Sequence, residues 1–204
     1  MPPKNKYKAV LFDLGGTLVK TLSPAETFYR ILALYGISVS VDKVAEAHRE
    51  NMKTFDNRAL AREGRKYWIK WNAQILKKIG VKENVDLLAG KIDELWWDYA
   101  DLEVYPEAVD TLNLLKAKGI KLGIVTNGFK TEIDQILHKL GLENYFDVGV
   151  GADSCRKAKP DKKIFWYALE KLGVQAEEAL FVGDDFEADY AGAIKAGLHA
   201  LLLD

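Results

Sequence analysis

The second half of the chain alternates between helix-like and strand-like stretches, and this alternation limits the folds it can adopt. Helical patterns at about 106–118, 131–140 and 161–172 each end at a glycine, and strand-like apolar runs lie at 120–125, 146–150, 179–182 and 199–203. Helix and strand units of this length predict a parallel sheet with helices on both faces. The expected fold class is therefore α/β.

The first half begins with one more strand and continues with helices alone. Residues 9–12 form a short apolar run that stops at Asp13 and two glycines, as expected for a buried strand ending in a tight loop. Ser23, Pro24 and Glu26 form a capping box at a helix start. Four helical patterns follow one another, at about 24–35, 42–55, 62–79 and 84–100. The sequence therefore predicts an all-helical insertion over 18–103, and a sheet domain made of 1–17 and 104–204.

Polar residues follow four of the predicted strands at the point where each strand ends. They are Asp13, Thr126–Asn127, Asp153–Ser154 and Asp184–Asp185. Open α/β sheets bind ligands beyond the carboxyl ends of their strands. We therefore expect these residues to converge on one crevice.

Four short motifs occur in a fixed order along the chain. They are Asp13-Leu14-Gly15-Gly16-Thr17, Thr126-Asn127-Gly128, Lys159-Pro160, and Gly183-Asp184-Asp185 with Asp189. Their order, their placement at strand ends and the helical insertion after the first resemble the haloacid-dehalogenase-like hydrolases over essentially the whole chain. The resemblance implies a Rossmann-like hydrolase core and a helical cap domain that covers the site and selects the substrate.

The resemblance also assigns chemistry to individual residues. Asp13 matches the nucleophile that forms an aspartyl phosphate, and a carboxylate is suited to this covalent catalysis. Asp184, with Asp13 and the backbone carbonyl of Gly15, matches a magnesium (Mg2+) site of hard oxygen ligands. We expect Asp185 and Asp189 to support that site by hydrogen bonds rather than to ligate the metal.

The other two motifs match residues that hold the transferring phosphoryl group. Thr126 and Asn127 correspond to the phosphate-binding hydroxyl and backbone amides, and Lys159 corresponds to the lysine that neutralises charge. Lys157 lacks the following proline and is interpreted as a surface charge. The expected protein is a magnesium-dependent phosphatase that acts on a small phosphate monoester.

Gly15 departs from the usual pattern of the family's phosphatases. An aspartate usually stands there, two residues after the nucleophile, and serves as general acid and base. Loss of such a group typically lowers the rate by about 10²- to 10⁴-fold. Turnover is therefore expected to be slow, unless a cap side chain, water or a good leaving group compensates. A protein that binds phosphate ligands without turnover is the alternative from another class.

Two further enzymatic readings stay open. A 2-haloacid dehalogenase shares the nucleophile but uses no metal, and such a site gains nothing from the crowded carboxylates of Asp184, Asp185 and Asp189. A phosphonatase-like enzyme needs a cap lysine that forms a Schiff base. The candidates for that lysine, none marked out by its sequence context, are Lys43, Lys53, Lys66 and Lys70.

Composition restricts the partners. Lys plus Arg number 29 and Asp plus Glu 30, so the charge balance does not favour nucleic acid. The single cysteine, Cys155, cannot form an intrachain disulfide, which fits a reducing cytoplasm. No apolar run reaches the roughly 18 residues of a membrane span. We expect a cytoplasmic protein with a small phosphorylated substrate; the sequence carries no signal for an oligomeric state.

Overall fold

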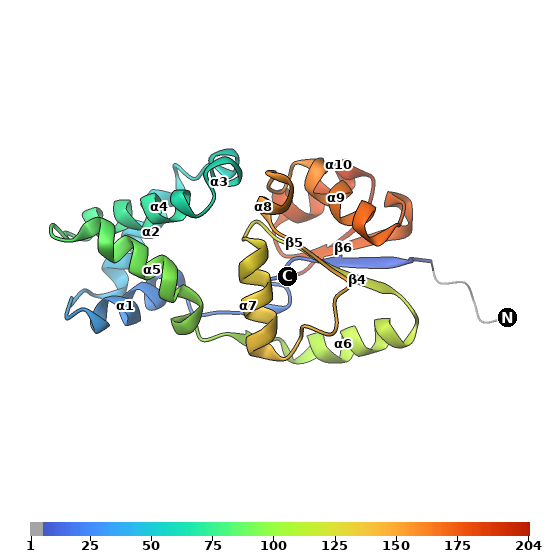
Figure 1. The fold of residues 1–204 in the computed structure, drawn as a ribbon, viewed down its shortest axis with the longest axis horizontal. Coiled ribbons are helices and arrows are strands. Elements are labelled where there is room, and N and C mark those ends of the chain that lie inside the picture. Colours follow the sequence, from blue (N-terminus) through green and yellow to red (C-terminus); the bar gives the residue numbers. More distant parts are fainter. Residues whose placement is uncertain (1–5) are drawn as a thin grey trace. The chain divides into compact units, whose positions relative to one another are not determined.

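A five-stranded parallel sheet forms the centre of the larger part of the chain (Figure 1). The structure is a computed structural model that describes residues 6–204. In this described part, the strand order is β5-β4-β1-β6-β7. The strands are β1 Ala9–Phe12, β4 Lys121–Val125, β5 Val148–Val150, β6 Ala179–Gly183 and β7 His199–Leu202. The expected α/β fold class with a Rossmann-like parallel sheet is confirmed.

Helices cover both faces of this sheet, with α9 and α10 on one side and α6 on the other (Figure 1). The longer ones are α6 Pro106–Ala117, α7 Lys130–Leu140 and α9 Lys162–Leu172, joined by the short α8 Ala152–Cys155, α10 Gly192–Ala196, 3-10 turn η1 Ala176–Glu178 and π-helical turn η2 Phe186–Ala191. All four residues of β1 are buried. Strands covered on both faces consist of nearly continuous apolar residues, which explains the short uninterrupted runs in the sequence.

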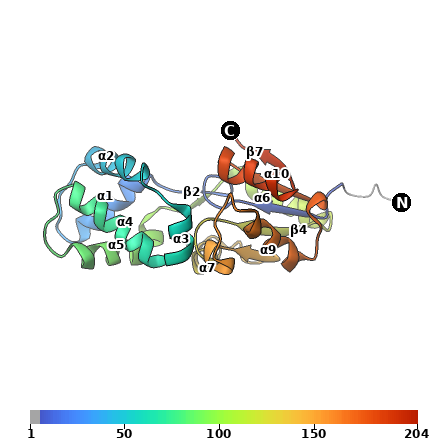
Figure 2. The ribbon, with the colours of Figure 1, turned by 90° about the horizontal axis from the view of Figure 1, so that it is seen from above.

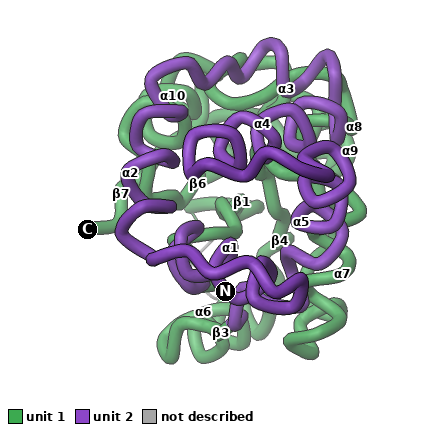
Figure 3. Tube along the Cα trace, turned by 90° about the vertical axis from the view of Figure 1, so that its left-hand side faces the viewer, with its two compact units in different colours: residues 1–20, 103–204 green, residues 21–102 purple. Residues whose placement is uncertain are grey.

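The chain divides into two compact units (Figure 3). Unit 1 extends to Lys20 and resumes at Glu103, and unit 2 is Thr21–Leu102. A two-stranded antiparallel ribbon, β2 Val19–Lys20 with β3 Glu103–Val104, lies at the two crossings between the units. The sequence predicts the domain boundaries at 17/18 and 103/104. Strands of two residues show no periodicity, so the ribbon itself was not predicted.

Unit 2, which is described throughout, contains helices alone apart from its loops (Figure 2). They are α1 Pro24–Leu34, α2 Val41–Met52, α3 Asn57–Glu63, α4 Arg65–Lys78 and α5 Val85–Tyr99. The capping box at the start of α1 is confirmed, because the Glu26 amide donates to Ser23 Oγ and the Ser23 amide donates to Glu26 Oε2. The expected inserted helical segment is thus present.

The helix count of about four in this segment is corrected to five. Asp56 accepts hydrogen bonds from the amides of Arg58 and Ala59 and so begins α3, a helix that the periodic pattern did not reveal. Gly64, with φ +62, then separates α3 from α4. The helical pattern expected over 62–79 therefore belongs to two helices.

Unit 2 has its own aromatic core. Trp71 is buried and packs edge-to-face against Trp68 and Phe55, with ring centroids 6.2 and 5.2 Å apart. The two tryptophans lie three residues apart in α4, so they share a helix face, and both serve the core of the unit. Over the described part of the chain, no helix is long and apolar enough to cross a bilayer.

Candidate active site

A buried lysine joins two carboxylates at the carboxyl end of the parallel sheet. Lys159 Nζ lies 2.6 Å from Asp13 Oδ1 and 2.5 Å from Asp189 Oδ1. Asp13 follows β1, Asp189 lies in η2 after β6, and Lys159 lies in the loop before α9. The exposed side-chain fractions of Lys159 and Asp189 are 3% and 1%. Charges this buried are tolerated because each faces an opposite charge.

The charge state of Lys159 follows from its surroundings. Burial alone disfavours the ammonium, but the Coulombic attraction and hydrogen bonds of Asp13 and Asp189 outweigh it, and the pKa of Lys159 is raised above its ordinary value. Lys159 therefore stays protonated at neutral pH. The pKa of Asp189 is also raised, because burial and the nearby Asp13 carboxylate together exceed the effect of Lys159.

Asn127, which follows β4, holds the backbone of Lys159. Its Oδ1 accepts a hydrogen bond of 2.6 Å from the Lys159 amide, and its Nδ2 donates one of 3.2 Å to the Lys159 carbonyl. The resemblance placed Asn127 among the phosphate-binding residues through its backbone. The side chain of Asn127 in addition positions the backbone of Lys159, a role that the sequence did not indicate. Thr126 Oγ1 accepts from the Gly128 amide at 3.2 Å in the same turn.

Asn127→Asp is expected to lower the free energy of unfolding by about 1–3 kcal/mol, because it replaces one hydrogen-bond donor by an acceptor that faces the Lys159 carbonyl. Urea denaturation measures this change. Asn144→Asp, at an exposed position, is the matched control and should change stability by less than about 0.5 kcal/mol. Equal midpoints for the two variants would show that the Asn127 contact carries no stability.

Asp184 lies against the loop that follows β1. Thr17 Oγ1 donates a hydrogen bond of 3.0 Å to Asp184 Oδ1. A Cβ at Gly16, whose φ is +78, would lie 2.4 Å from Asp184 Oδ2. The glycine thus leaves the space that the Asp184 carboxylate occupies, one residue beyond Gly15.

Three carboxylates come close enough together to hold a cation. Asp13, Asp184 and Asp189 each offer one oxygen, and these oxygens lie within 4.8 Å of one another. A set of hard oxygen donors fits Mg2+. Asp189 already accepts hydrogen bonds from Lys159 Nζ and from the Asp185 amide, and the Asp185 side chain accepts from the Ala188 amide. Both carboxylate oxygens of Asp189 are therefore engaged, whereas Asp13 and Asp184 each accept one hydrogen bond, from Lys159 and Thr17.

The Asp189 side chain packs against the end of β6, and Gly183 provides the space for it. A Cβ at Gly183 would lie 2.3 Å from Asp189 Oδ2. A side chain at this position would therefore displace the carboxylate that binds Lys159. The sequence marked Gly183 only as part of a motif, whereas the structure gives its physical reason.

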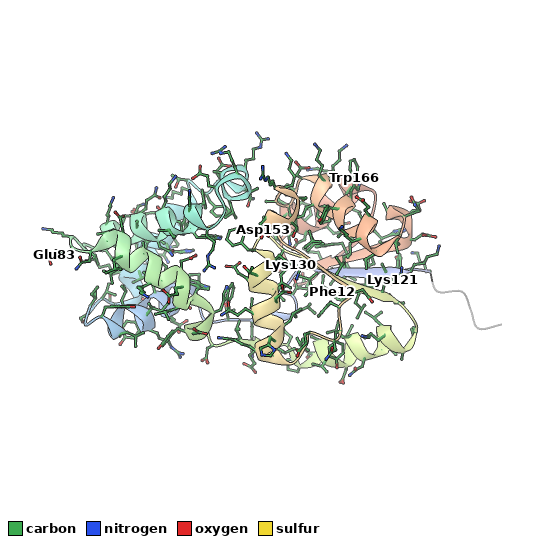
Figure 4. The ribbon with its side chains drawn as sticks, in the orientation of Figure 1. Phe12, Glu83, Lys121, Lys130, Asp153 and Trp166 are labelled. Carbon is green, nitrogen blue, oxygen red and sulfur yellow. The ribbon has the colours of Figure 1, made fainter. Side chains whose placement is uncertain are left out.

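The side chains of Asp153 and Ser154 bond to backbone amides at helix starts instead of this cluster. Asp153 Oδ1 accepts from the amide of Lys130 at 2.9 Å, and Ser154 Oγ accepts from the amide of Gly151 at 3.1 Å (Figure 4). These bonds satisfy the backbone at the starts of α7 and α8. Hydrogen bonds join Asp13, Asn127, Lys159 and Asp189 into one network, whereas the side chains of Asp153 and Ser154 bond to the amides of Lys130 and Gly151.

Gly15 is exposed beside this network. Within the described residues, and apart from Gly15 itself and its two chain neighbours, no heavy atom lies within 4 Å of the position that a Cβ at Gly15 would occupy. The backbone there has space for a side chain, so the glycine is not required by packing.

The protein has a parallel α/β unit that a helical segment interrupts after its first strand. A carboxylate–lysine cluster lies at the strand ends of this unit. Together these features define the class of protein as a two-unit hydrolase. The family model of haloacid dehalogenase-like hydrolases matches residues 7–197. The chain therefore belongs to the haloacid dehalogenase-like hydrolases.

Relatives with phosphatase names support the same family. The glyceraldehyde 3-phosphate phosphatase of Methanopyrus kandleri is 31% identical over 94% of this chain and 81% of its own. The crystal structure of a HAD phosphatase from Thermococcus onnurineus is 31% identical, with a TM-score of 0.62 over 97% of this chain and 86% of the other. That of a 2-haloacid dehalogenase from Pseudomonas syringae pv. Tomato DC3000 is 29% identical, with a TM-score of 0.70 over 96% and 86%.

Proposed function

We propose that this hydrolase is a magnesium-dependent phosphatase that acts on a small phosphate monoester through an aspartyl phosphate on Asp13. The observation that carries the proposal is the contact between Asp13 and the buried Lys159, next to the carboxylate of Asp184. The phosphatase names of its relatives support the reaction class. A cytoplasmic location and the absence of nucleic-acid partners belong to the same proposal.

Asp13 is placed to attack phosphorus while one of its oxygens is held. Lys159 donates to Oδ1, so Oδ2 is the oxygen that forms the new bond to phosphorus. As that bond forms, the bond from phosphorus to the leaving oxygen breaks, and this oxygen takes a proton from water to become the alcohol, because Gly15 has no side chain to donate one. Water then attacks the phosphoryl group, which releases phosphate and restores the Asp13 carboxylate.

Lys159 and the loop after β4 stabilise the charge of the transferring group. Lys159 supplies a fixed positive charge, and its position is set by Asp189 and Asn127. Preorganised charges of this kind are worth more in a buried site than in water. Thr126 and the backbone amides at Asn127 are assigned to the phosphoryl oxygens.

Asp13, Asp184 and the carbonyl of Gly15 would hold the magnesium ion, with Asp185 and Asp189 in supporting positions. The ion supplies charge neutralisation between the nucleophile and an anionic substrate. Selection of the substrate is assigned to the helical segment 18–103, in which the sequence places the cap domain.

The wild-type protein is expected to release phosphate from an activated aryl phosphate with magnesium and to lose this activity with a chelator. Gly15→Asp is expected to raise kcat by about 10²-fold for sugar phosphates, whose leaving groups need a proton. The open space at Gly15 allows the aspartate to fit. Phosphate release from a panel of sugar, triose and nucleoside phosphates measures both effects.

The outcomes of this assay separate the competing functions. Activity of wild type that persists with chelator would contradict the role of magnesium. Tight phosphate-ester binding without turnover in wild type, together with turnover by Gly15→Asp, would identify a binding protein instead of an enzyme. The control Asn144→Asp, which adds a carboxylate at an exposed position of unit 1, should leave phosphate release unchanged.

The dehalogenase is retained as a second candidate because of the 29% identity to the Pseudomonas syringae protein. Halide release from a 2-haloacid, without added metal, would identify it. The phosphonatase reading receives no such support: Lys43, Lys53, Lys66 and Lys70 are all exposed, and Lys70 pairs with Glu63. A Schiff-base lysine is usually activated by desolvation or by another cation.

A further inference from the structure

An aromatic ring lies beside the ammonium group of Lys159. Lys159 Nζ is positioned over the face of Phe181, 5.4 Å from the ring centroid. Phe181 is fully buried in β6, three residues before Asp184. A cation within about 6 Å of an aromatic face is attracted by the negative potential of the ring, most strongly where water is excluded. Lys159 thus has a third electrostatic contact besides its two carboxylates.

Phe181 is fixed in position by the pairing of its own strand with β1. It packs edge-to-face against Phe165 of α9, with ring centroids 5.1 Å apart and an interplanar angle of 79°. In the sheet, Phe181 pairs with Leu11 of β1, two residues before Asp13. The backbone pairing therefore fixes the ring relative to the strand that carries Asp13, and this pairing does not depend on the side chain of Phe165.

A lysine side chain is flexible, so a fixed contact is needed to keep its ammonium group in one direction. Its ammonium is a compact charge on a flexible stem, and it can donate three hydrogen bonds in rotatable directions. Asp13 and Asp189 take two of these. We propose that Phe181 is a positioning residue that, through its ring face, keeps the Lys159 ammonium directed at Asp13 during phosphoryl transfer.

Phe181→Leu tests this role, with Phe165→Leu as the matched control. Both phenylalanines are fully buried in the same core cluster, so both variants lose packing. Only Phe181 presents its face to Lys159. We expect kcat of Phe181→Leu to fall about tenfold with KM nearly unchanged, and kcat of Phe165→Leu to stay within about twofold of wild type. Phe181→Tyr, which keeps the ring, should restore most of the lost rate.

The kinetic test rests on the proposed function, so a second measurement that does not depend on enzymatic activity is needed. Protons of the Lys159 side chain near an aromatic face are shifted upfield by the ring current. In NMR spectra of lysine-labelled protein, assigned with Lys159→Arg, this shift should disappear in Phe181→Leu and persist in Phe165→Leu. If wild type released no phosphate, the proposed function would fail while this spectrum still decided the role of Phe181.

Two results would overturn the inference. One is an equal fall in kcat for Phe165→Leu and Phe181→Leu, since the effect would then be general packing. The other is an unchanged Lys159 resonance in Phe181→Leu, which would show that the ring does not act on the ammonium. A selective loss in Phe181→Leu with rescue by Phe181→Tyr supports it.

Discussion

Asp13→Asn is expected to lower kcat for phosphate release by at least about 10⁴-fold, because a carboxamide cannot form the phosphoryl ester that a carboxylate forms. The fold should persist. Lys159 keeps its ion pair with Asp189, which is almost wholly buried, and asparagine can still accept a hydrogen bond from Lys159 Nζ. Steady-state release from an activated aryl phosphate measures the loss, and circular dichroism confirms folding.

Asp153→Asn is the matched control for this variant. Asp153 also follows a strand of the sheet, but its carboxylate accepts from the Lys130 amide at the start of α7, a bond that asparagine can retain. Its kcat should stay within about twofold of wild type. If Asp13→Asn kept more than about one per cent of the wild-type rate, Asp13 would not be the nucleophile.

Lys159→Met is expected to abolish phosphate release and to lower the free energy of unfolding by about 3–5 kcal/mol. Methionine fills a similar volume, so the loss reports charge more than packing. Without the ammonium, Asp13 and Asp189 would face each other in a site where their side chains are 13% and 1% exposed. Urea denaturation measures the stability, and the same aryl phosphate assay measures the activity.

Lys157→Met provides the comparison at the surface. Lys157 pairs with Asp161 at 3.5 Å, with 42% of its side chain exposed, and exposed pairs contribute only about 0–1 kcal/mol. Adding Asp189→Asn to Lys159→Met should recover part of the lost stability, because it removes an unpaired buried charge. Equal unfolding midpoints for Lys159→Met and Lys157→Met would contradict the stabilising role of the buried pair.

The sequence was sufficient for the class of fold because burial on both faces forces a strand such as β1 to be apolar throughout. Helices that begin with clear caps, such as α1 at Ser23, were also predictable. Helix α3 was missed because most of it lies between the helical patterns at 42–55 and 62–79, and its separation from α4 was missed because Gly64 falls inside the second pattern. β2 and β3 were missed because pairing, and not local pattern, defines strands of two residues.

The candidate site was predictable to the level of motif residues and no further. Motif order indicated Asp13, Lys159, Asp184 and Asp189, and the structure brings the first two into direct contact. The amide of Asn127 on the Lys159 backbone and the ring of Phe181 under its ammonium depend on tertiary contacts between residues more than twenty positions apart. Such contacts leave no local signature in one sequence.

The ribbon of β2 and β3 has a consequence for how this protein can be engineered. Lys20 and Glu103 are partners in the ribbon, so the two ends of the intervening chain are fixed about 5 Å apart. A hairpin loop of about two to five residues spans that gap. The whole segment between them can therefore be treated as an exchangeable cassette, grafted or replaced by a turn, with the hydrogen-bonded stem preserving the strand that carries Asp13.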